Sequence, residues 1–141
     1  MSTEKTIMYK RPGGSRFWWL KGGGRHREDG PAVELASGTR EWWLNGKQHR
    51  EDGPAVEYAY GDREWWLNGK QHREDGPAVE KADGSREWWL NGERHREDGP
   101  AVEYANGNRE WYYKGIKLRV RTLKGLQKAI KLFHIQEVQE S

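Results

Sequence analysis

The sequence contains no cysteine and no long apolar run. Without cysteine, neither a disulfide framework nor a thiolate metal site can form. The longest apolar run is a few residues, whereas a helix that spans a bilayer needs roughly 20. The first 14 residues have no apolar core and therefore do not resemble a signal peptide. We expect a cytoplasmic protein with no membrane span.

Aliphatic residues are also scarce, and large aromatic rings take their place. Only 33% of the 141 residues are hydrophobic, 33% are charged, and the mean hydropathy is −1.20. Such a composition is typical of disordered chains. Nine tryptophans argue against disorder, because disordered segments are poor in large aromatic residues. The chain is therefore expected to fold around a few large rings.

Charge is distributed unevenly along the chain. Seven of the 25 basic residues lie between positions 114 and 131, where there is no acidic residue. The rest of the chain carries 18 basic against 22 acidic residues, so it is mildly acidic although the whole chain has a net charge of +3. The basic residues of the segment are Lys114, Lys117, Arg119, Arg121, Lys124, Lys128 and Lys131.

An internal repeat of 23 residues dominates the sequence. The string HREDGPAVE begins at His26, His49, His72 and His95. Between these strings stands REWWLNG, at residues 40–46, 63–69 and 86–92, with the variant REWYYKG at residues 109–115. Terminal copies of a repeat array are usually atypical, because they close its ends. We divide the chain into an N-terminal extension (1–15), a repeat array of about 4.5 copies (16–115) and a basic C-terminal strand and helix (116–141).

Each unit has the signals of a β-hairpin. Asn-Gly at 45–46, 68–69 and 91–92 favours a type I′ turn, which needs a positive φ at both central residues. The preceding Arg-Glu-Trp-Trp-Leu is rich in residues that suit a strand. A unit of this length has no room for a crossover helix, so the strands are expected to be antiparallel and sequential. The sequence predicts an all-β repeat fold, an elongated single-layer antiparallel hairpin array.

The C-terminal segment has the pattern of an amphipathic helix. Thr122 is a plausible N-cap, and apolar residues follow at Leu123, Leu126, Ile130 and Phe133. An array of hairpins ends in an exposed strand edge, which proteins usually protect. We expect this helix to cap the array.

The repeat resembles a known family. The 23-residue period, the aromatic-aromatic-x-Asn-Gly core and the glycine-punctuated hairpins are similar to MORN repeats, and more closely to the MORN-variant repeats of bacterial and phage proteins. The resemblance covers about residues 16–115, although Arg-Glu-Trp replaces the usual Tyr-x-Gly and Asp-Gly-Pro-Ala replaces Gly-x-Gly. It implies an extended antiparallel hairpin array. It also implies scaffolding, association with proteins or membranes or, for some bacterial members, an antitoxin-like role.

His-Arg-Glu-Asp is the only stretch that suggests chemistry. A histidine beside two carboxylates could act as a base or bind a metal ion. The group recurs once per repeat, however, whereas an active site needs one convergent constellation. We therefore favour a structural role, with aspartate forming the turn before Gly-Pro and arginine and glutamate pairing across strands. A row of ion sites is the alternative.

Alternation along a strand assigns the tryptophans to two faces. Trp42 and Leu44 share one face, while Glu41 and Trp43 share the other. If the Trp42 face forms the buried ladder, the second tryptophan of each pair is the more accessible. The predicted contact stripe therefore consists of that second column and two tyrosines at a variable position: Trp43, Trp66, Trp89, Tyr58 and Tyr104.

The function predicted from these features is a non-catalytic protein-binding repeat module without cofactor or metal, of the inhibitor or antitoxin type that phages and mobile elements encode. The first alternative is a nucleic-acid-binding protein that uses the exposed Trp and Arg columns and the basic segment. Its predicted contacts there are Lys117, Arg119, Arg121, Lys124, Lys128 and Lys131. The second alternative is a metal-dependent enzyme that uses the repeated His-Glu-Asp. Oligomerisation could use the strand edges or the C-terminal helix.

Overall fold

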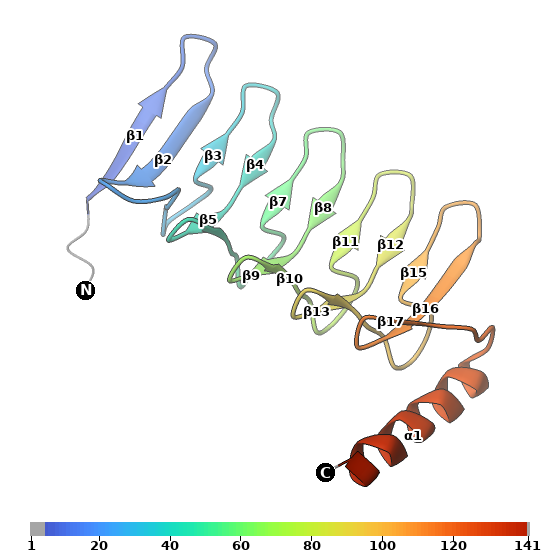
Figure 1. Cartoon of the computed structure of the whole chain (residues 1–141). Coiled ribbons are helices and arrows are strands. Elements are labelled where there is room, and N and C mark those ends of the chain that lie inside the picture. Colours follow the sequence, from blue (N-terminus) through green and yellow to red (C-terminus); the bar gives the residue numbers. More distant parts are fainter. Residues whose placement is uncertain (1–4, 141) are drawn as a thin grey trace.

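The computed structural model describes residues 5–140 and confirms the predicted all-β repeat fold (Figure 1). Eleven strands form one long open sheet in which every pair of neighbours is antiparallel. Three small two-stranded hairpins lie along one side of this sheet, and the helix α1 (Leu123–Glu140) lies at its C-terminal end. The array is therefore a single elongated layer.

The long sheet follows the order of the chain, apart from the strands of the small hairpins. Its strands are β1 (Thr6–Lys10), β2 (Arg16–Leu20), β3 (Val33–Glu34), β4 (Arg40–Glu41), β7 (Val56–Glu57), β8 (Arg63–Glu64), β11 (Val79–Glu80), β12 (Arg86–Glu87), β15 (Val102–Glu103), β16 (Arg109–Tyr113) and β17 (Ile116–Leu118). The small hairpins pair β5 (Trp43–Leu44) with β6 (Lys47–Gln48), β9 (Trp66–Leu67) with β10 (Lys70–Gln71), and β13 (Trp89–Leu90) with β14 (Glu93–Arg94).

The two termini of the array extend this sheet. Part of the segment predicted as an N-terminal extension forms β1, which pairs with β2 from Thr6 opposite Leu20 to Lys10 opposite Arg16. At the other end β17 pairs with β16. Residues 1–4 and 141, which belong to the predicted terminal segments, lie outside the described residues. No helix within residues 5–140 combines the length and the apolar character needed to cross a membrane.

The strand predicted over Arg-Glu-Trp-Trp-Leu is interrupted at its first tryptophan in the three central copies. The backbone N–H of Trp42 donates to Ala55 O at 2.7 Å, next to β7 of the long sheet. The Trp42 carbonyl instead accepts from His49 N–H at 3.1 Å, within the small hairpin, and the Trp43 carbonyl accepts from Arg27 N–H of the preceding repeat at 3.1 Å. The chain changes partners at the tryptophan pair, so the small hairpins stack on one another beside the sheet.

The Asn-Gly turns have the predicted conformation. Asn68 has a φ of 50° and Gly69 a φ of 80°, and the other two Asn-Gly pairs are within a few degrees of these values. Positive φ at both central residues is the mark of a type I′ turn. In the last copy Lys114 takes the same conformation with a φ of 48°, so the fold imposes the turn even without asparagine.

In the central copies the buried core is made of small residues rather than of tryptophan rings, whereas Trp111 of the last copy is buried. The Ala-Val pair of each Pro-Ala-Val-Glu string is buried, with every alanine fully inaccessible, whereas all six tryptophans of the central copies are half-buried. The alanine lies where the chain changes partners, and its carbonyl accepts the hydrogen bond from the first tryptophan of the pair in the adjoining strand. A side chain this small permits the close approach of neighbouring strands. The expected division into a buried and an accessible tryptophan column is therefore not seen in the central copies.

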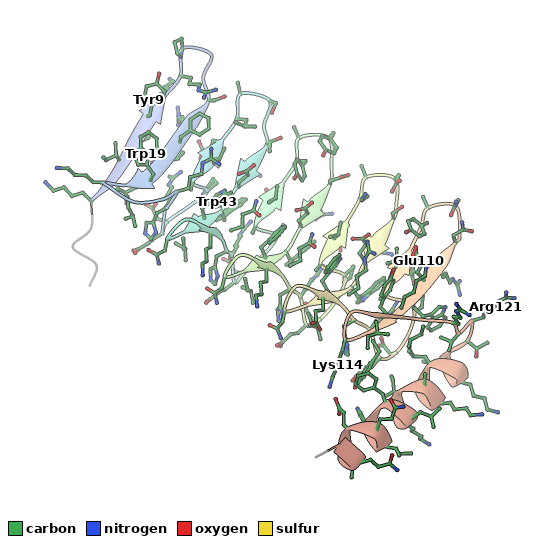
Figure 2. All side chains as sticks on the ribbon, viewed as in Figure 1. Tyr9, Trp19, Trp43, Glu110, Lys114 and Arg121 are labelled. Atoms are coloured by element: carbon green, nitrogen blue, oxygen red, sulfur yellow. The ribbon has the colours of Figure 1, made fainter. Side chains whose placement is uncertain are left out.

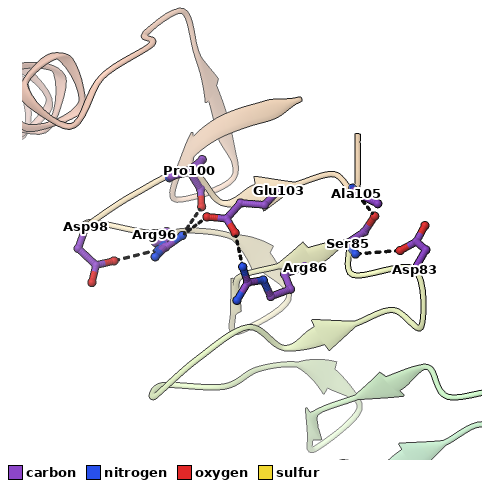
Figure 3. Close-up of polar contacts among 8 residues, drawn as sticks. All are labelled: Asp83, Ser85, Arg86, Arg96, Asp98, Pro100, Glu103 and Ala105. Carbon is purple, nitrogen blue, oxygen red and sulfur yellow. Dashed lines mark hydrogen bonds and ion pairs between the residues drawn. The ribbon is translucent and has the colours of Figure 1, made fainter. Parts of the chain in front are cut away.

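Polar side chains link successive repeats at both ends of each long hairpin. At the outer turns, Thr39 Oγ1 accepts from Ala59 N–H at 3.0 Å, and Ser85 Oγ accepts from Ala105 N–H at 3.0 Å (Figure 3). At the small hairpins, His49 Nδ1 accepts from Asn68 N–H at 3.0 Å. The same histidine bond recurs in each repeat, from Asn45 to His26, from Asn91 to His72 and from Lys114 to His95.

The C-terminal helix packs against the last repeat. Its N-cap is Thr122, as predicted, since Thr122 Oγ1 accepts from Gly125 N–H at 3.0 Å. Leu126 is completely buried, and the ring of Phe133 packs edge-on against Tyr113 at 5.2 Å between centroids. Lys114, labelled in Figure 2, lies between the last hairpin and α1, where its Nζ contacts Glu137 at 3.2 Å. This arrangement is consistent with the predicted helical cap.

Candidate functional site

A row of similar hollows lies between successive His-Arg-Glu-Asp loops. The three central hollows have volumes of about 710, 760 and 610 Å³. Each is lined by two such loops and by the first tryptophan and the leucine of one Trp-Trp-Leu string: Trp42 with Leu44, Trp65 with Leu67, and Trp88 with Leu90. A fourth hollow of about 460 Å³ contains Trp18 at the N-terminal end. We call this row the Trp groove.

An arginine fixes each tryptophan of the groove. The guanidinium carbon of Arg96 lies 3.7 Å from the ring centroid of Trp88, a cation–π geometry. Arg96 also donates to Asp98 at 3.0 Å, to the carbonyl of Pro100 at 2.9 Å and to Glu103 at 3.2 Å (Figure 3). The equivalent groups of the other copies are Arg27 over Trp18, Arg50 over Trp42 and Arg73 over Trp65. These arginines hold the loops in place.

The rim of the groove is acidic. The four loops carry eight carboxylates against four guanidinium groups, and the arginines are also bound to the Pro-Ala-Val-Glu glutamates. The side chains of Glu51 and Asp52 are 84% and 87% exposed, and their equivalents are similarly open. Exposed carboxylates beside an aromatic surface favour a cationic ligand.

The histidines of these loops have a structural contact. Because Nδ1 accepts a backbone hydrogen bond, the proton of the neutral ring is on Nε2, which faces the glutamate two residues later. His49 Nε2 lies 3.5 Å from Glu51 Oε1, and the other copies are alike. Among residues 5–140, no group of three or more His, Asp and Glu side chains is placed to hold a metal ion. The histidines therefore join each loop to the turn of the next repeat.

The predicted contact stripe lies apart from the Trp groove. Trp43, Trp66 and Trp89 line none of the four hollows and are half-buried. Their indole Nε1 groups donate to the glutamate two residues earlier, at 2.8, 2.9 and 3.0 Å. Alternation along the strand thus assigned the faces as the structure has them, and the loops gather on the face of the first tryptophan.

The two tyrosines of the predicted stripe have different surroundings. Tyr58 is half-buried and stacks on Tyr60 at 5.2 Å, and burial raises its pKa. Tyr104 is exposed and donates to Glu110 Oε1 at 2.6 Å. That hydrogen bond lowers the pKa of Glu110, so this carboxylate stays ionised to a lower pH than an ordinary glutamate does. Neither tyrosine lines the Trp groove.

The predicted basic contacts are all exposed: Lys117, Arg119, Arg121, Lys124, Lys128 and Lys131. They come from β17, from the segment that follows it and from α1. Lys117 contacts Glu110 at 3.2 Å. The structure therefore places these residues at the C-terminal end, away from the row of hollows.

No protein-family model matches the chain, and no curated protein matches its sequence.

The signal that could have located the Trp groove was present in the repeat. His-Arg-Glu-Asp and the tryptophan pair recur with the same period, so any contact between them in one copy is expected to recur in the others. Which tryptophan contacts the loops depends on the change of backbone partners at the tryptophan pair. No residue pattern in the sequence predicts that change.

Proposed function

We propose that this chain is a non-catalytic, protein-binding repeat module whose partner lies along the Trp groove. The observation that carries the proposal is the row of equivalent hollows, each with a half-buried tryptophan at its wall and exposed carboxylates at its rim. Tryptophan is enriched among the residues that dominate binding energy in interfaces. Repeating such a unit along a rigid array gives an extended surface suited to a long partner.

The arrangement of the loops supports a role other than catalysis. Their histidines, arginines and aspartates are bound to the fold's own backbone and side chains in the same way in each copy. Catalysis requires a single constellation with an activated group. Repeated equivalent loops are better suited to binding one long ligand through several similar contacts.

The proposal includes membership of the MORN-like class of repeats. Its support is the 23-residue period together with the antiparallel hairpin array and its Asn-Gly turns. Scaffolding and antitoxin-like inhibition, the roles that this resemblance implies, both require a protein bound along the array. An inhibitor of this kind would act by covering its partner's surface.

A second candidate is nucleic-acid binding, and the six exposed basic residues of the C-terminal end favour it. Phosphate contacts of this kind make binding fall steeply with salt concentration. Such binding would depend on the basic residues and not on the tryptophans of the groove.

The two tryptophan columns allow a matched test of the proposal. Peptides selected from a display library on the full chain provide ligands, and calorimetry measures their affinity for Trp65→Ala and Trp66→Ala. Both residues are half-buried, so the two variants lose similar packing. We expect Trp65→Ala to weaken binding by about 2 kcal/mol or more, roughly 30-fold. Trp66→Ala should stay within about threefold of the wild type.

The reverse result would return the contact surface to the column of Trp43, Trp66 and Trp89. If neither substitution affects binding, the partner does not use the tryptophan faces. Neutralising Lys124 and Lys128 would then test the C-terminal end.

A further inference from the structure

The hollows of the Trp groove are spaced at a distance that the sheet determines. Successive repeats advance the long sheet by two strands, from β4 to β8 and from β8 to β12. Neighbouring strands are about 4.8 Å apart, so equivalent hollows recur about every 9.6 Å. A ligand that presents the same side chain to each hollow must have a matching period.

Polyproline II helix has the closest period among regular peptide conformations. It advances about 3.1 Å per residue with three residues per turn, so every third side chain faces the same way after about 9.3 Å. An extended strand advances about 10 Å in three residues, but successive side chains alternate, so the third points to the opposite face. Seven residues of α-helix advance about 10.5 Å and fall out of step with the groove by almost 1 Å at every repeat.

The chemistry of the groove agrees with this period. Aromatic-lined grooves recognise polyproline II segments because the rings of proline pack on the aromatic surface. Each of the three central hollows supplies one tryptophan and one leucine for such packing, for example Trp65 and Leu67, and the N-terminal hollow supplies Trp18 and Met8. Each also supplies one exposed Glu-Asp pair, for example Glu74 and Asp75, whose side chains are 85% and 88% exposed. One cation per three residues would match one acidic pair per repeat.

We propose that the Trp groove binds a proline-rich basic segment in the polyproline II conformation, with lysine or arginine at every third residue. This inference rests on the proposed protein-binding function and specifies its ligand. Prolines lie against the tryptophans, and the cation of each turn lies between the carboxylates of the loops. Four hollows accommodate about four turns, which is about 12 residues.

The test compares two peptides of identical composition on the full-length chain. One is a 12-residue peptide of four Pro-Pro-Arg units, and the other carries the same eight prolines and four arginines with irregular spacing. Affinity is measured by calorimetry at moderate salt for the wild type, Trp65→Ala and the matched control Trp66→Ala. We expect the regular peptide to bind at least tenfold more tightly than the irregular one. We also expect Trp65→Ala, but not Trp66→Ala, to remove most of this preference.

A second arm varies length and conformation. Affinity for Pro-Pro-Arg peptides should rise up to four units and then level off, because the hollows are filled. A helical peptide with arginine at every seventh position serves as the competitor, and tighter binding of that peptide would overturn the proposal in favour of a helical ligand. Equal affinity of the regular and irregular peptides would also overturn it, since attraction by charge alone ignores spacing.

The outcome separates this inference from the proposed function. The display-selected peptides could depend on Trp65 and yet lack a cationic residue at every third position. That result would contradict the polyproline ligand and keep the groove as the binding site. If Trp65→Ala changes the affinity of neither the selected nor the synthetic peptides, both the proposed ligand and the proposed binding site are wrong.

Discussion

Contacts between repeats and contacts to the C-terminal helix are built in opposite ways. Each junction of the array repeats the same small set: a histidine bond, a polar bond at the outer turn and backbone bonds between small hairpins. At one junction, Arg50 N–H donates to Trp66 O at 3.1 Å and Gly69 N–H donates to Gln48 O at 2.9 Å. No single one of these bonds holds the junction alone.

The helix, by contrast, depends on a cluster around one residue. Tyr113 is 3% exposed, its ring packs on Phe133 and its hydroxyl lies 2.7 Å from His134 Nε2. On α1, Leu132, Ile135 and Val138 are exposed, Val138 by 74%. The helix is therefore attached through one side, from Leu126 to Glu137, and other apolar side chains of α1 are exposed.

This difference predicts that substitutions in the array and at the helix anchor will change stability in two different ways. An array stabilised by nearest-neighbour contacts distributes a local loss over adjacent repeats, because each repeat contributes to the folding of the next. An element held by one cluster opens by itself when the cluster weakens, at a cost below that of global unfolding. Substitutions in the array should thus lower global stability, and substitutions at Tyr113 should release only α1.

The largest effect is expected from breaking a turn at an array junction. Gly69 has a φ of 80°, which a β-branched residue adopts only with strain, so Gly69→Val should cost about 2–3 kcal/mol of global stability. Chemical denaturation measures this loss. Gly13→Val is the control, since Gly13 has no positive φ and a Cβ there meets nothing within 4 Å. The control should change stability by less than about 0.5 kcal/mol, and an equally small effect of Gly69→Val would contradict the role of the turn.

The turns also show how far the sequence predicts this fold. The period, the Asn-Gly pairs and the short unit predicted the antiparallel hairpin array, because each is a local signal with a steric cause. Thr122 likewise predicted the start of α1. The change of partners after Trp42 was missed, since alternation of side chains describes a strand and says nothing of which backbone it pairs with.

The candidate site was predicted less well for the same reason. Alternation placed Trp42 and Trp43 on opposite faces correctly, but the choice between the faces was made by assuming a buried tryptophan ladder. In the central copies the buried positions belong to alanine and valine, so neither tryptophan of a pair is fully buried there. Burial of the small residues follows from contacts between repeats, which no single unit reveals.

A moderate effect is expected from removing one histidine bond. His72→Leu has similar bulk but leaves Asn91 N–H without its side-chain acceptor, and this should cost about 1 kcal/mol of global stability by chemical denaturation. Glu74→Gln is the matched control: the Glu74 side chain is 85% exposed and lies 3.5 Å from His72 Nε2, so its charge contributes little. Equal losses in both variants would assign the stabilisation to the ion pair instead of the backbone bond.

The smallest global effect, and the sharpest local one, is expected at the anchor of the helix. The Tyr113 hydroxyl is protonated at neutral pH, as tyrosine ordinarily is, and burial raises its pKa further, so it can bond to His134. Tyr113→Phe retains the ring contact with Phe133 and removes that bond. We expect global stability to change by less than about 1 kcal/mol, while amide hydrogens of α1 exchange several-fold faster and those of the array are unchanged.

Tyr112→Phe separates the loss of a hydroxyl from the loss of the anchor. The Tyr112 hydroxyl donates to Glu110 Oε2 at 3.1 Å and accepts from Arg94 at 3.4 Å, both in the array, so this variant should leave exchange in α1 at the wild-type rate. Faster exchange throughout the array in Tyr113→Phe would mean that the helix stabilises the repeats as a unit. Unchanged exchange in α1 would mean that Leu126 and the ring contact hold the helix without the hydroxyl. Only selective release of α1 agrees with an array held by many equivalent contacts and a helix held by the contacts around Tyr113.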